Sequence, residues 1–268
     1  MKAVEIDTIS KVYPDGTKAL NNVSFSVEKG EAVVLLGHNG SGKSTLFRSI
    51  TSFEQPTSGE IRIDGITITG LKKRKLRPIR KKIGMVFQHF NLINNLSVFQ
   101  NVLFGALGQT KFTFQTYSPF ASKELRMKAM ECLSRVGLTH LAKRRADQLS
   151  GGQQQRVAIA RMLMQDPEIV LADEPIASLD PKAGREVMDL LWEIVRERGL
   201  TVVCILHQMD IAKEYGNRIV ALKSGNVVLD STIHALNDKF IKELYEKEVN
   251  EEGDEESIKV DVKKVGVL

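Results

Sequence analysis

The sequence predicts an α/β fold, in which a largely parallel sheet carries helices on both faces. Continuous apolar runs with the length of buried strands occupy residues 32–36, 169–172 and 201–206, and stretches of helical pattern separate them. One of these stretches, residues 184–198, places its apolar side chains at helical spacing. Strand–helix–strand alternation of this kind gives parallel strands joined by helices.

A mostly helical segment interrupts this alternation between about residue 90 and residue 165, and we interpret it as an inserted helical subdomain. Within it, residues 107–120 are loop-like and contain four aromatic side chains. Partly exposed aromatic side chains in a loop can mark a partner surface. Packing back onto the helical subdomain is the alternative.

The first 68 residues have the alternation that is typical of strands. A turn at residues 14–16 follows apolar positions in residues 4–9, and residues 23–27 alternate apolar and polar side chains. Residues 61–68 indicate a hairpin, or a turn between two edge strands.

Length and composition indicate a globular protein. At 268 residues, the chain is long enough for one large domain, or for one core with a smaller appendage. Its hydrophobic content of 42% and charged content of 26% are ordinary for soluble proteins. It has no apolar run of about eighteen residues and no signal-peptide core, so we expect a cytoplasmic protein. Cys132 and Cys204 lack metal-ligand spacing and are expected to be reduced, structural thiols.

Charge is distributed unevenly along the chain, whose formal net charge is +5. Residues 72–82 carry eight basic side chains, and residues 243–256 carry eight acidic ones. We interpret the acidic segment as solvated surface. The basic run is either solvated surface or a contact for anionic lipid headgroups. Because it has no interleaved aromatic side chains to stack bases, no nucleic-acid partner is expected.

A glycine-rich loop at residues 37–45 follows the first apolar run and precedes a helical pattern. Backbone N–H groups from Asn39 to Thr45 are expected to form a nest around the β-phosphate of a nucleotide. Lys43 would reach the β- and γ-phosphate oxygens, and the Ser44 hydroxyl can ligate Mg²⁺. The expected phosphate-binding residues are Gly37, Asn39, Gly40, Ser41, Gly42, Lys43, Ser44 and Thr45.

A second anion site is predicted at the start of the helical run after residue 150. Ser150, Gly151, Gly152 and Gln153 would expose backbone N–H groups at the positive end of that helix. This site lies too far along the sequence to belong to the first loop. Two half-sites for one phosphate chain suggest two copies that face each other with ATP between them.

Two carboxylates, Asp173 and Glu174, end the apolar run at residues 169–172. Ligand sites of parallel sheets lie beyond the carboxyl ends of the strands, where both side chains would project. Asp173 suits the coordination shell of a metal ion, and Glu174 can orient the attacking water and accept its proton. The alternative is that the acidic pair only caps the next helix.

Three further side chains are candidates for the same crevice. His207 follows the last apolar run and would reach the γ-phosphate, although such a histidine is often structural. Gln88 follows an apolar stretch at residues 83–87 and could sense Mg²⁺ or water. Tyr13 could stack on adenine, with a place in the core as the alternative.

These segments, in this order, resemble the motifs of the ATP-binding cassette (ABC) ATPases, and the resemblance extends to about residue 245. The corresponding motifs are the A-loop Tyr13, Walker A at residues 37–45, the Q-loop Gln88, the signature at residues 149–153, Walker B at residues 169–173, the catalytic Glu174, the D-loop at residues 178–180 and the H-loop His207. The resemblance implies a P-loop nucleoside-triphosphatase fold over residues 1–245. It would contain an antiparallel β subdomain and the helical subdomain at about residues 90–165, with a charged tail at residues 246–268.

The same resemblance assigns roles and partners. Gln88 joins Glu174 and His207 as catalytic residues, and joins Ser44 and Asp173 as Mg²⁺ ligands, while Asp180 contacts nucleotide. Family members form head-to-tail dimers that bind two ATP molecules and close on binding. The absence of a membrane span matches importers whose cassette docks on separate permease subunits, so a peripheral place on the cytoplasmic side of the inner membrane is implied. A periplasmic or lipid-anchored solute-binding protein would be an indirect partner.

Three segments resemble the phosphonate importer ATPases, a subfamily that includes phosphite systems. They are residues 87–92, 172–181 and 206–212. Amino-acid importers usually carry Thr-Ser-Ala where this chain has Ile176-Ala177-Ser178. The expected function is therefore the ATP-hydrolysing subunit of a phosphonate-type importer. The alternatives are an amino-acid importer, an export or cell-division cassette, and an ABC ATPase that acts on nucleic acid or ribosomes.

Overall fold

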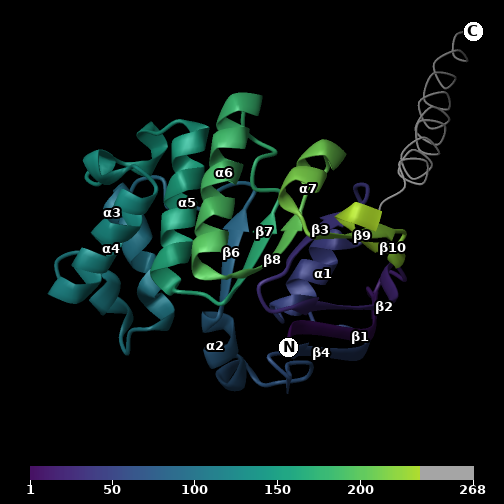
Figure 1. The fold of residues 1–268 in the computed structure, drawn as a ribbon. Coiled ribbons are helices and arrows are strands. Elements are labelled where there is room, and N and C mark those ends of the chain that lie inside the picture. Colours follow the sequence, from purple (N-terminus) through teal and green to yellow (C-terminus); the bar gives the residue numbers. More distant parts are fainter. Residues whose placement is uncertain (236–268) are drawn as a thin grey trace, which may run out of the picture. The chain divides into compact units, whose positions relative to one another are not determined.

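Two sheets organise the chain in the computed structural model, which describes residues 1–235 (Figure 1). The antiparallel sheet has the strand order β2-β1-β4-β5, and the mainly parallel sheet has the order β10-β9-β3-β8-β7-β6. The first sheet contains β1 (Lys2–Val12), β2 (Lys18–Glu28), β4 (Ser58–Ile63) and β5 (Ile66–Thr67). The second contains β3 (Ala32–Leu36), β6 (Ile83–Phe87), β7 (Ile169–Asp173), β8 (Thr201–Ile205), β9 (Arg218–Lys223) and β10 (Asn226–Thr232).

Met1–Asp230 form one compact unit, and the described residues 231–235 lie outside it. The described helices are α1 (Lys43–Ile50), α2 (Lys73–Lys81), α3 (Val98–Leu103), α4 (Lys123–Arg135), α5 (Gly151–Gln165), α6 (Pro181–Arg198) and α7 (Met209–Tyr215), with short 3-10 turns η1 (Phe104–Gly108), η2 (Thr113–Thr116), η3 (Thr139–Leu141), η4 (Ala146–Gln148) and η5 (Ile233–Ala235). The charged tail predicted at residues 246–268 lies outside the described residues.

The central strands β3, β7 and β8 are buried almost throughout because both faces of the sheet are covered there. Alternate residues such as Val33 and Val203 join one core with α1 and the antiparallel sheet. On β6, Ile83 belongs to this core, whereas the next residue, Gly84, faces α5: a Cβ on Gly84 would lie 2.7 Å from Met162 Cγ. The predicted α/β fold with helices on both faces is therefore confirmed.

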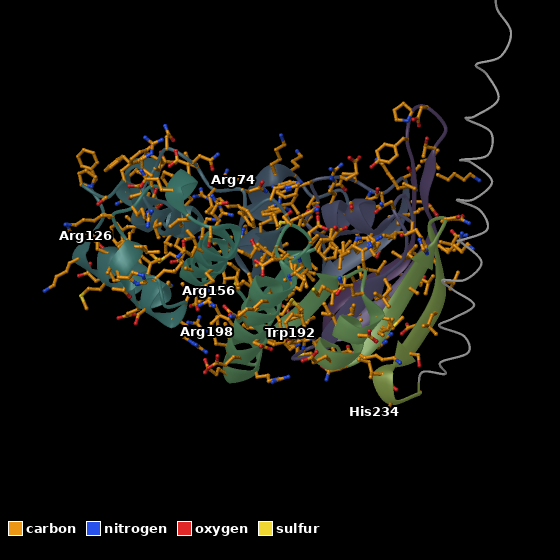
Figure 2. The ribbon with its side chains drawn as sticks, turned by 90° about the horizontal axis from the view of Figure 1, so that it is seen from above. Arg74, Arg126, Arg156, Trp192, Arg198 and His234 are labelled. Carbon is orange, nitrogen blue, oxygen red and sulfur yellow. The ribbon has the colours of Figure 1, made fainter. Side chains whose placement is uncertain are left out.

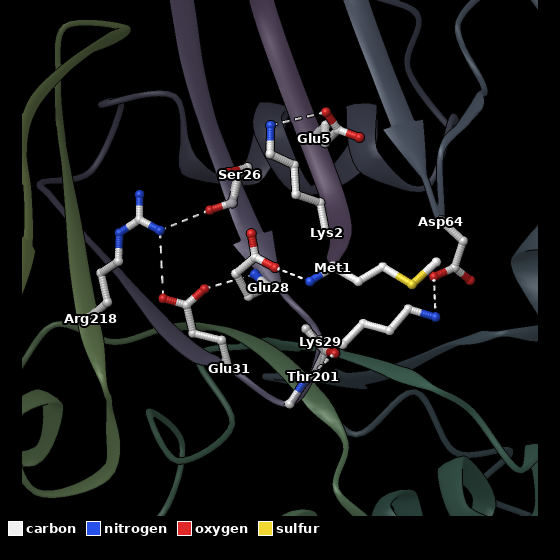
Figure 3. A network of polar contacts seen from close by, with 11 residues as sticks. Met1, Lys2, Glu5, Ser26, Glu28, Lys29, Glu31, Asp64, Thr201 and Arg218 are labelled. Atoms are coloured by element: carbon white, nitrogen blue, oxygen red, sulfur yellow. Dashed lines mark hydrogen bonds and ion pairs between the residues drawn. The ribbon is translucent and has the colours of Figure 1, made fainter.

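Arg218, at the start of β9, ties the two sheets together. Its Nη1 donates to the carbonyl of Ser26 on β2 at 2.9 Å and lies 3.5 Å from Glu31 Oε1 (Figure 3). Gly30 N donates to Thr201 Oγ1 on β8 at 3.0 Å. These contacts fix the turn that leads into β3, the strand that ends at the glycine-rich loop.

In the segment that the sequence predicts to be helical, α3, α4 and α5 pack against one another. The aromatic stretch at residues 107–120 contains η2 and is anchored by Gln100, a buried residue of α3. Gln100 Nε2 donates to Thr116 O at 2.7 Å, and Ser118 N donates to Gln100 Oε1 at 2.9 Å. Tyr117 packs edge-on against Phe104, in agreement with packing back onto the helical subdomain, while the partner surface stays a prediction. The others, Phe112, Phe114 and Phe120, contact one another and stay more than half exposed.

The basic run forms α2, a helix that the sequence analysis does not predict. Leu76 and Ile79 are its buried side chains and belong to the main core. Arg80 donates to the carbonyls of Thr51 and Ser52, both at 2.9 Å. These two carbonyls directly follow the C-terminal end of α1, so Arg80 supplies the donors that they need. The other basic side chains of α2 surround this narrow apolar stripe.

Side-chain contacts join α5, α6 and α7 in sequence. Arg156 on α5 pairs with Glu186 on α6 at 3.1 Å, and Trp192 Nε1 donates to the carbonyl of Tyr215, the last residue of α7. Figure 2 labels Arg156 and Trp192 on their helices.

Both cysteines are free and buried, and burial raises the pKa of the Cys132 thiol to about 11. Among residues 1–235, no helix is long and apolar enough to cross a membrane.

Candidate functional site

The glycine-rich loop runs from the end of β3 to the first turn of α1 and passes very close to neighbouring backbone. Gly37 has φ +141° and Gly42 has φ +106°. A Cβ would lie 2.2 Å from Leu222 O at Gly37 and 2.4 Å from Ala19 O at Gly42. Only glycine fits these two positions, because a side chain would clash with the backbone of β9 at Gly37 and with that of β2 at Gly42.

Lys43 is the buried cation of this loop, with 5% of its surface exposed. Its Nζ donates to Gly37 O at 2.5 Å and to His38 O at 2.8 Å. Burial lowers the pKa of Lys43, and the nearby charges of Glu174 and Asp173 partly oppose this effect. The structure therefore brings the loop lysine close to the two carboxylates at the end of β7.

The other loop residues lie around Lys43. Asn39, Gly40 and Ser44 are exposed, while Ser41 is buried. The hydroxyl of Tyr13 lies 3.4 Å from Thr45 Oγ1, and Lys11 Nζ lies 5.1 Å from the centre of the Tyr13 ring. Tyr13 is half-buried beside the start of α1, so the structure places it at the loop rather than in the core.

Three strands deliver the predicted catalytic residues to one edge of the sheet. Phe87 pairs with Asp173, and Asp173 pairs with Ile205. Consequently Gln88, Glu174 and the segment before His207 leave the sheet side by side. Asp173 is half-buried; burial, followed by the charge of Glu174, raises the pKa of its carboxyl group.

Glu174 and His207 form the closest polar contact at this edge. His207 Nε2 lies 2.6 Å from Glu174 Oε1. Glu174 has φ +47°, a left-handed conformation that is unusual for a residue with a side chain and that recurs at functional sites. A cavity of about 450 Å³ opens beside the pair, and Leu179, Asp180 and Tyr215 are among its lining residues.

The start of α5 carries the second predicted anion site. Ser150 Oγ accepts from Gln153 N at 3.4 Å, and Gln153 Oε1 accepts from Ser150 N at 3.1 Å, which forms a capping box. A Cβ on Gly151 would lie 3.0 Å from Leu179 Cδ2, and one on Gly152 would lie 3.3 Å from Ala183 Cβ. The two glycines therefore allow α5 to begin directly against the segment around the start of α6.

Asp180 is the N-cap of α6, where its Oδ1 accepts from Ala183 N at 3.0 Å. The side chain has a structural partner in this arrangement. Its predicted contact with nucleotide remains a prediction, as do the predicted ligand roles of the other site residues.

The sequence analysis misses one buried residue at this site, Gln155 on α5. Its Nε2 donates to Pro175 O at 2.7 Å and to Phe87 O at 3.3 Å. Nothing in the run Gln153-Gln154-Gln155 shows which amide turns inward. Helical periodicity puts Gln155 on one face of α5 with Ala158, Ile159 and Met162, which are buried, but glutamine side chains are usually exposed.

Comparisons with known proteins agree with this geometry. Residues 20–177 match the ABC transporter family. The chain is 45% identical over 252 residues to the phosphonates import ATP-binding protein PhnC of Staphylococcus aureus, covering 94% of this chain and 98% of that protein. It is 46% identical over 248 residues to PhnC of Thiobacillus denitrificans, covering 92% and 94%.

Solved structures of cassettes are similar as well. The dimeric post-hydrolysis structure of the ATP-binding cassette MJ0796 bound to ADP and Pi has a TM-score of 0.76 at 39% identity, covering 87% of this chain and 100% of that chain. CbiO1 from Clostridium perfringens, part of the transporter complex cbiONQ, has a TM-score of 0.77 at 33% identity, covering 93% and 94%. The fold, the phosphate loop, the carboxylate edge and these similarities lead to one conclusion: the chain belongs to the ABC transporter family, as an ATP-hydrolysing cassette.

Proposed function

We propose that this chain is the ATPase subunit of an importer for phosphonates or related phosphorus compounds such as phosphite. The observation that carries the proposal is the 45% identity to a phosphonate import ATP-binding protein over nearly the whole length of both chains. The phosphate loop, the carboxylates after β7 and the signature segment described above support this activity. ATP is its substrate and energy source.

Hydrolysis at this site would rest on Glu174 and the side chains around it. Glu174 accepts the proton of the attacking water, and His207, 2.6 Å away, holds the carboxylate in place and reaches the γ-phosphate. The phosphate loop and Lys43 bind the phosphates. Gln88, at the same edge of the sheet, contacts the water or the cation.

A Mg²⁺ site fits the oxygen donors of Ser44, Asp173 and Gln88, because a hydroxyl, a carboxylate and an amide are the kinds of ligand that this ion prefers. Burial and Glu174 disfavour the charge on Asp173, so a nearby cation would compensate it. When bound, Mg²⁺ would neutralise charge on the β- and γ-phosphates.

Replacing Asp173 by Asn should therefore abolish Mg²⁺-dependent ATP hydrolysis without abolishing ATP binding. We expect the Kd for ATP measured without Mg²⁺ to be unchanged or lower, because a buried negative charge near the phosphates is removed. Titration of a fluorescent ATP analogue, with and without Mg²⁺, measures both effects. Loss of binding in the absence of Mg²⁺ would contradict this assignment.

The exposed signature segment supports assembly of two copies with ATP between them. Ser150 is exposed, and Gly151 and Gly152 present the start of α5 without side chains. The positive end of α5 would bind the γ-phosphate of an ATP held by the phosphate loop of the other copy. Closure of the dimer follows from the tighter binding of ATP by the closed state.

A groove beside the Q-loop fits the attachment of permease subunits. It encloses about 330 Å³, and Phe53, Arg80, Phe87, Phe104 and Arg161 are among its lining residues. Arg161 donates to the carbonyls of Phe90 at 2.9 Å and Asn91 at 2.5 Å, so its guanidinium connects this groove to the segment after Gln88. The cassette would thus lie peripherally on the cytoplasmic side of the inner membrane, with a solute-binding protein as an indirect partner and no nucleic acid.

Uptake measurements test the proposed substrate class. Cells that carry the wild-type gene should take up labelled methylphosphonate or phosphite, and cells that carry Glu174→Gln should not, because import requires hydrolysis. Glu197→Gln is the matched control, since this carboxylate pairs with Arg135 on the surface, 2.7 Å away and outside the site. Equal uptake of both compounds by Glu174→Gln and wild-type cells would refute the substrate assignment.

A further inference from the structure

Gln155 is a fully buried amide whose neighbours are the backbones of two catalytic segments. It lies on α5, just beyond the signature residues, and its side chain has no exposed surface. One acceptor, Phe87 O, belongs to the residue before Gln88. The other, Pro175 O, belongs to the residue after Glu174. A single side chain therefore connects the signature helix to both segments.

The orientation of this amide follows from its partners. Both neighbours are carbonyl oxygens, which only accept hydrogen bonds, so the NH₂ group must face them. Within the part of the chain that the structure describes, Gln155 Oε1 is then buried without a hydrogen-bond donor. The cost of this unpaired acceptor offsets much of the gain from the two donated bonds. Gln155 consequently stabilises the fold less than a buried amide with all of its partners would.

Pro175, whose carbonyl accepts from Gln155, directly follows Glu174, a residue with a strained backbone conformation. Glu174 has the left-handed φ of +47°, and its carboxylate is held by His207 Nε2 at 2.6 Å. Ala177 N donates to Glu174 O at 3.2 Å within the turn, whereas the bond from Gln155 to Pro175 O comes from outside it. The second bond to Phe87 O fixes the point where the chain leaves β6 toward Gln88.

We propose that Gln155 is a positioning residue. It fixes the positions of Glu174 and Gln88 relative to α5, the helix that begins at the signature residues. It contacts neither water nor nucleotide itself. It acts by holding the backbone on either side of the reacting groups, so that the start of α5 moves together with them when two copies close on ATP. This inference rests on the roles proposed above for Glu174 and Gln88.

The test replaces Gln155 by Met, which keeps the length of the side chain and its helix propensity but removes both donated bonds. Gln154→Met is the matched control, because Gln154 is adjacent on α5 and its amide donates to Ala146 O at 2.9 Å, away from both catalytic segments. For each purified full-length protein, the measurements are the thermal midpoint, the Kd for ATP, kcat, and ATP-dependent dimer formation in the Glu174→Gln background.

We expect Gln155→Met to lower kcat by roughly tenfold to a hundredfold, the effect of misplacing catalytic groups by about 1 Å. The Kd for ATP should stay close to wild type, since the phosphate loop is untouched. The thermal midpoint should fall modestly, because Pro175 O loses the donor that Gln155 supplies. ATP-dependent dimer formation should weaken. Gln154→Met should retain wild-type kcat.

Wild-type kcat in a folded Gln155→Met protein would overturn the inference, and so would an equal loss of kcat in Gln154→Met. If Gln155→Met does not fold, Gln155→Glu replaces it, because this change keeps the volume and polarity and still removes at least one donated bond. It should also lower kcat by about tenfold or more, and an unchanged kcat would again overturn the inference. A wild-type protein without ATPase activity would instead refute the proposed function itself.

Discussion

Glu174→Gln should lose steady-state ATP hydrolysis and keep ATP binding, with kcat lowered by roughly 10²–10⁴. Glutamine has nearly the same shape as glutamate and still offers an oxygen to His207 Nε2, 2.6 Å from the present carboxylate. It cannot accept a proton from water at neutral pH. The phosphate contacts proposed for Lys43 and the loop do not involve this carboxylate, so bound ATP should persist.

The same variant should form a stable dimer when ATP is added, because hydrolysis no longer removes the ATP that favours the closed state. Size-exclusion chromatography with and without ATP measures this shift, and a phosphate-release assay measures kcat. Glu197→Gln, which removes a surface ion pair between α6 and Arg135 of α4, should match wild type in both assays. A Glu174→Gln protein that hydrolyses ATP at the wild-type rate would remove Glu174 from its catalytic role.

Lys43→Ala should weaken ATP binding by about tenfold to a hundredfold, since a hydrogen bond to a charged group contributes about 1.5–3 kcal/mol. Lys43 is the buried cation of the phosphate loop, and its pKa is lowered by burial. Isothermal titration calorimetry of purified protein with ATP measures the Kd. Lys143→Ala, an exposed lysine of the helical segment, is the control and should bind like wild type.

A Kd for Lys43→Ala equal to that of wild type would show that the loop binds phosphate without its lysine. The thermal midpoint separates this from a folding defect. Replacing Lys43 leaves the carbonyls of Gly37 and His38 without the donor they now share, but it also removes a buried charge. These effects oppose each other, so the variant should remain folded.

The parts of the site that sequence predicts best are those formed by a few consecutive residues. The loop at residues 37–45 contains its own turns, cation and helix start, so spacing alone indicates its chemistry. The capping box of Ser150 and Gln153 is equally local. Their geometry depends little on what the rest of the chain does.

Contacts between distant segments could be predicted only in part. Glu174 and His207 each follow an apolar strand, but the sequence does not say that β7 and β8 are neighbours in register. The inward position of Gln155 depends on where β6 and the turn after Glu174 lie. Both features are set by tertiary packing.

The helix α2 shows the opposite case, in which local signals argue against the observed structure. Six of its nine residues are basic, and Pro78 lies inside it. Like charges on one helix repel, and an internal proline removes a backbone donor. Burial of Leu76 and Ile79 in the main core, together with the bonds from Arg80, outweighs these costs.

The Lys43 side chain is ordered by its own loop, which lowers the entropy that nucleotide binding must remove from it. A free lysine side chain loses conformational entropy of about 1.5–2 kcal/mol when it is immobilised. Here the ammonium group is already confined by the carbonyls of Gly37 and His38, 2.5 and 2.8 Å away, within its own loop. Folding has therefore already ordered the chain that carries the charge. A phosphate that meets this loop encounters a preorganised cation, and little rotational freedom remains to be lost on binding.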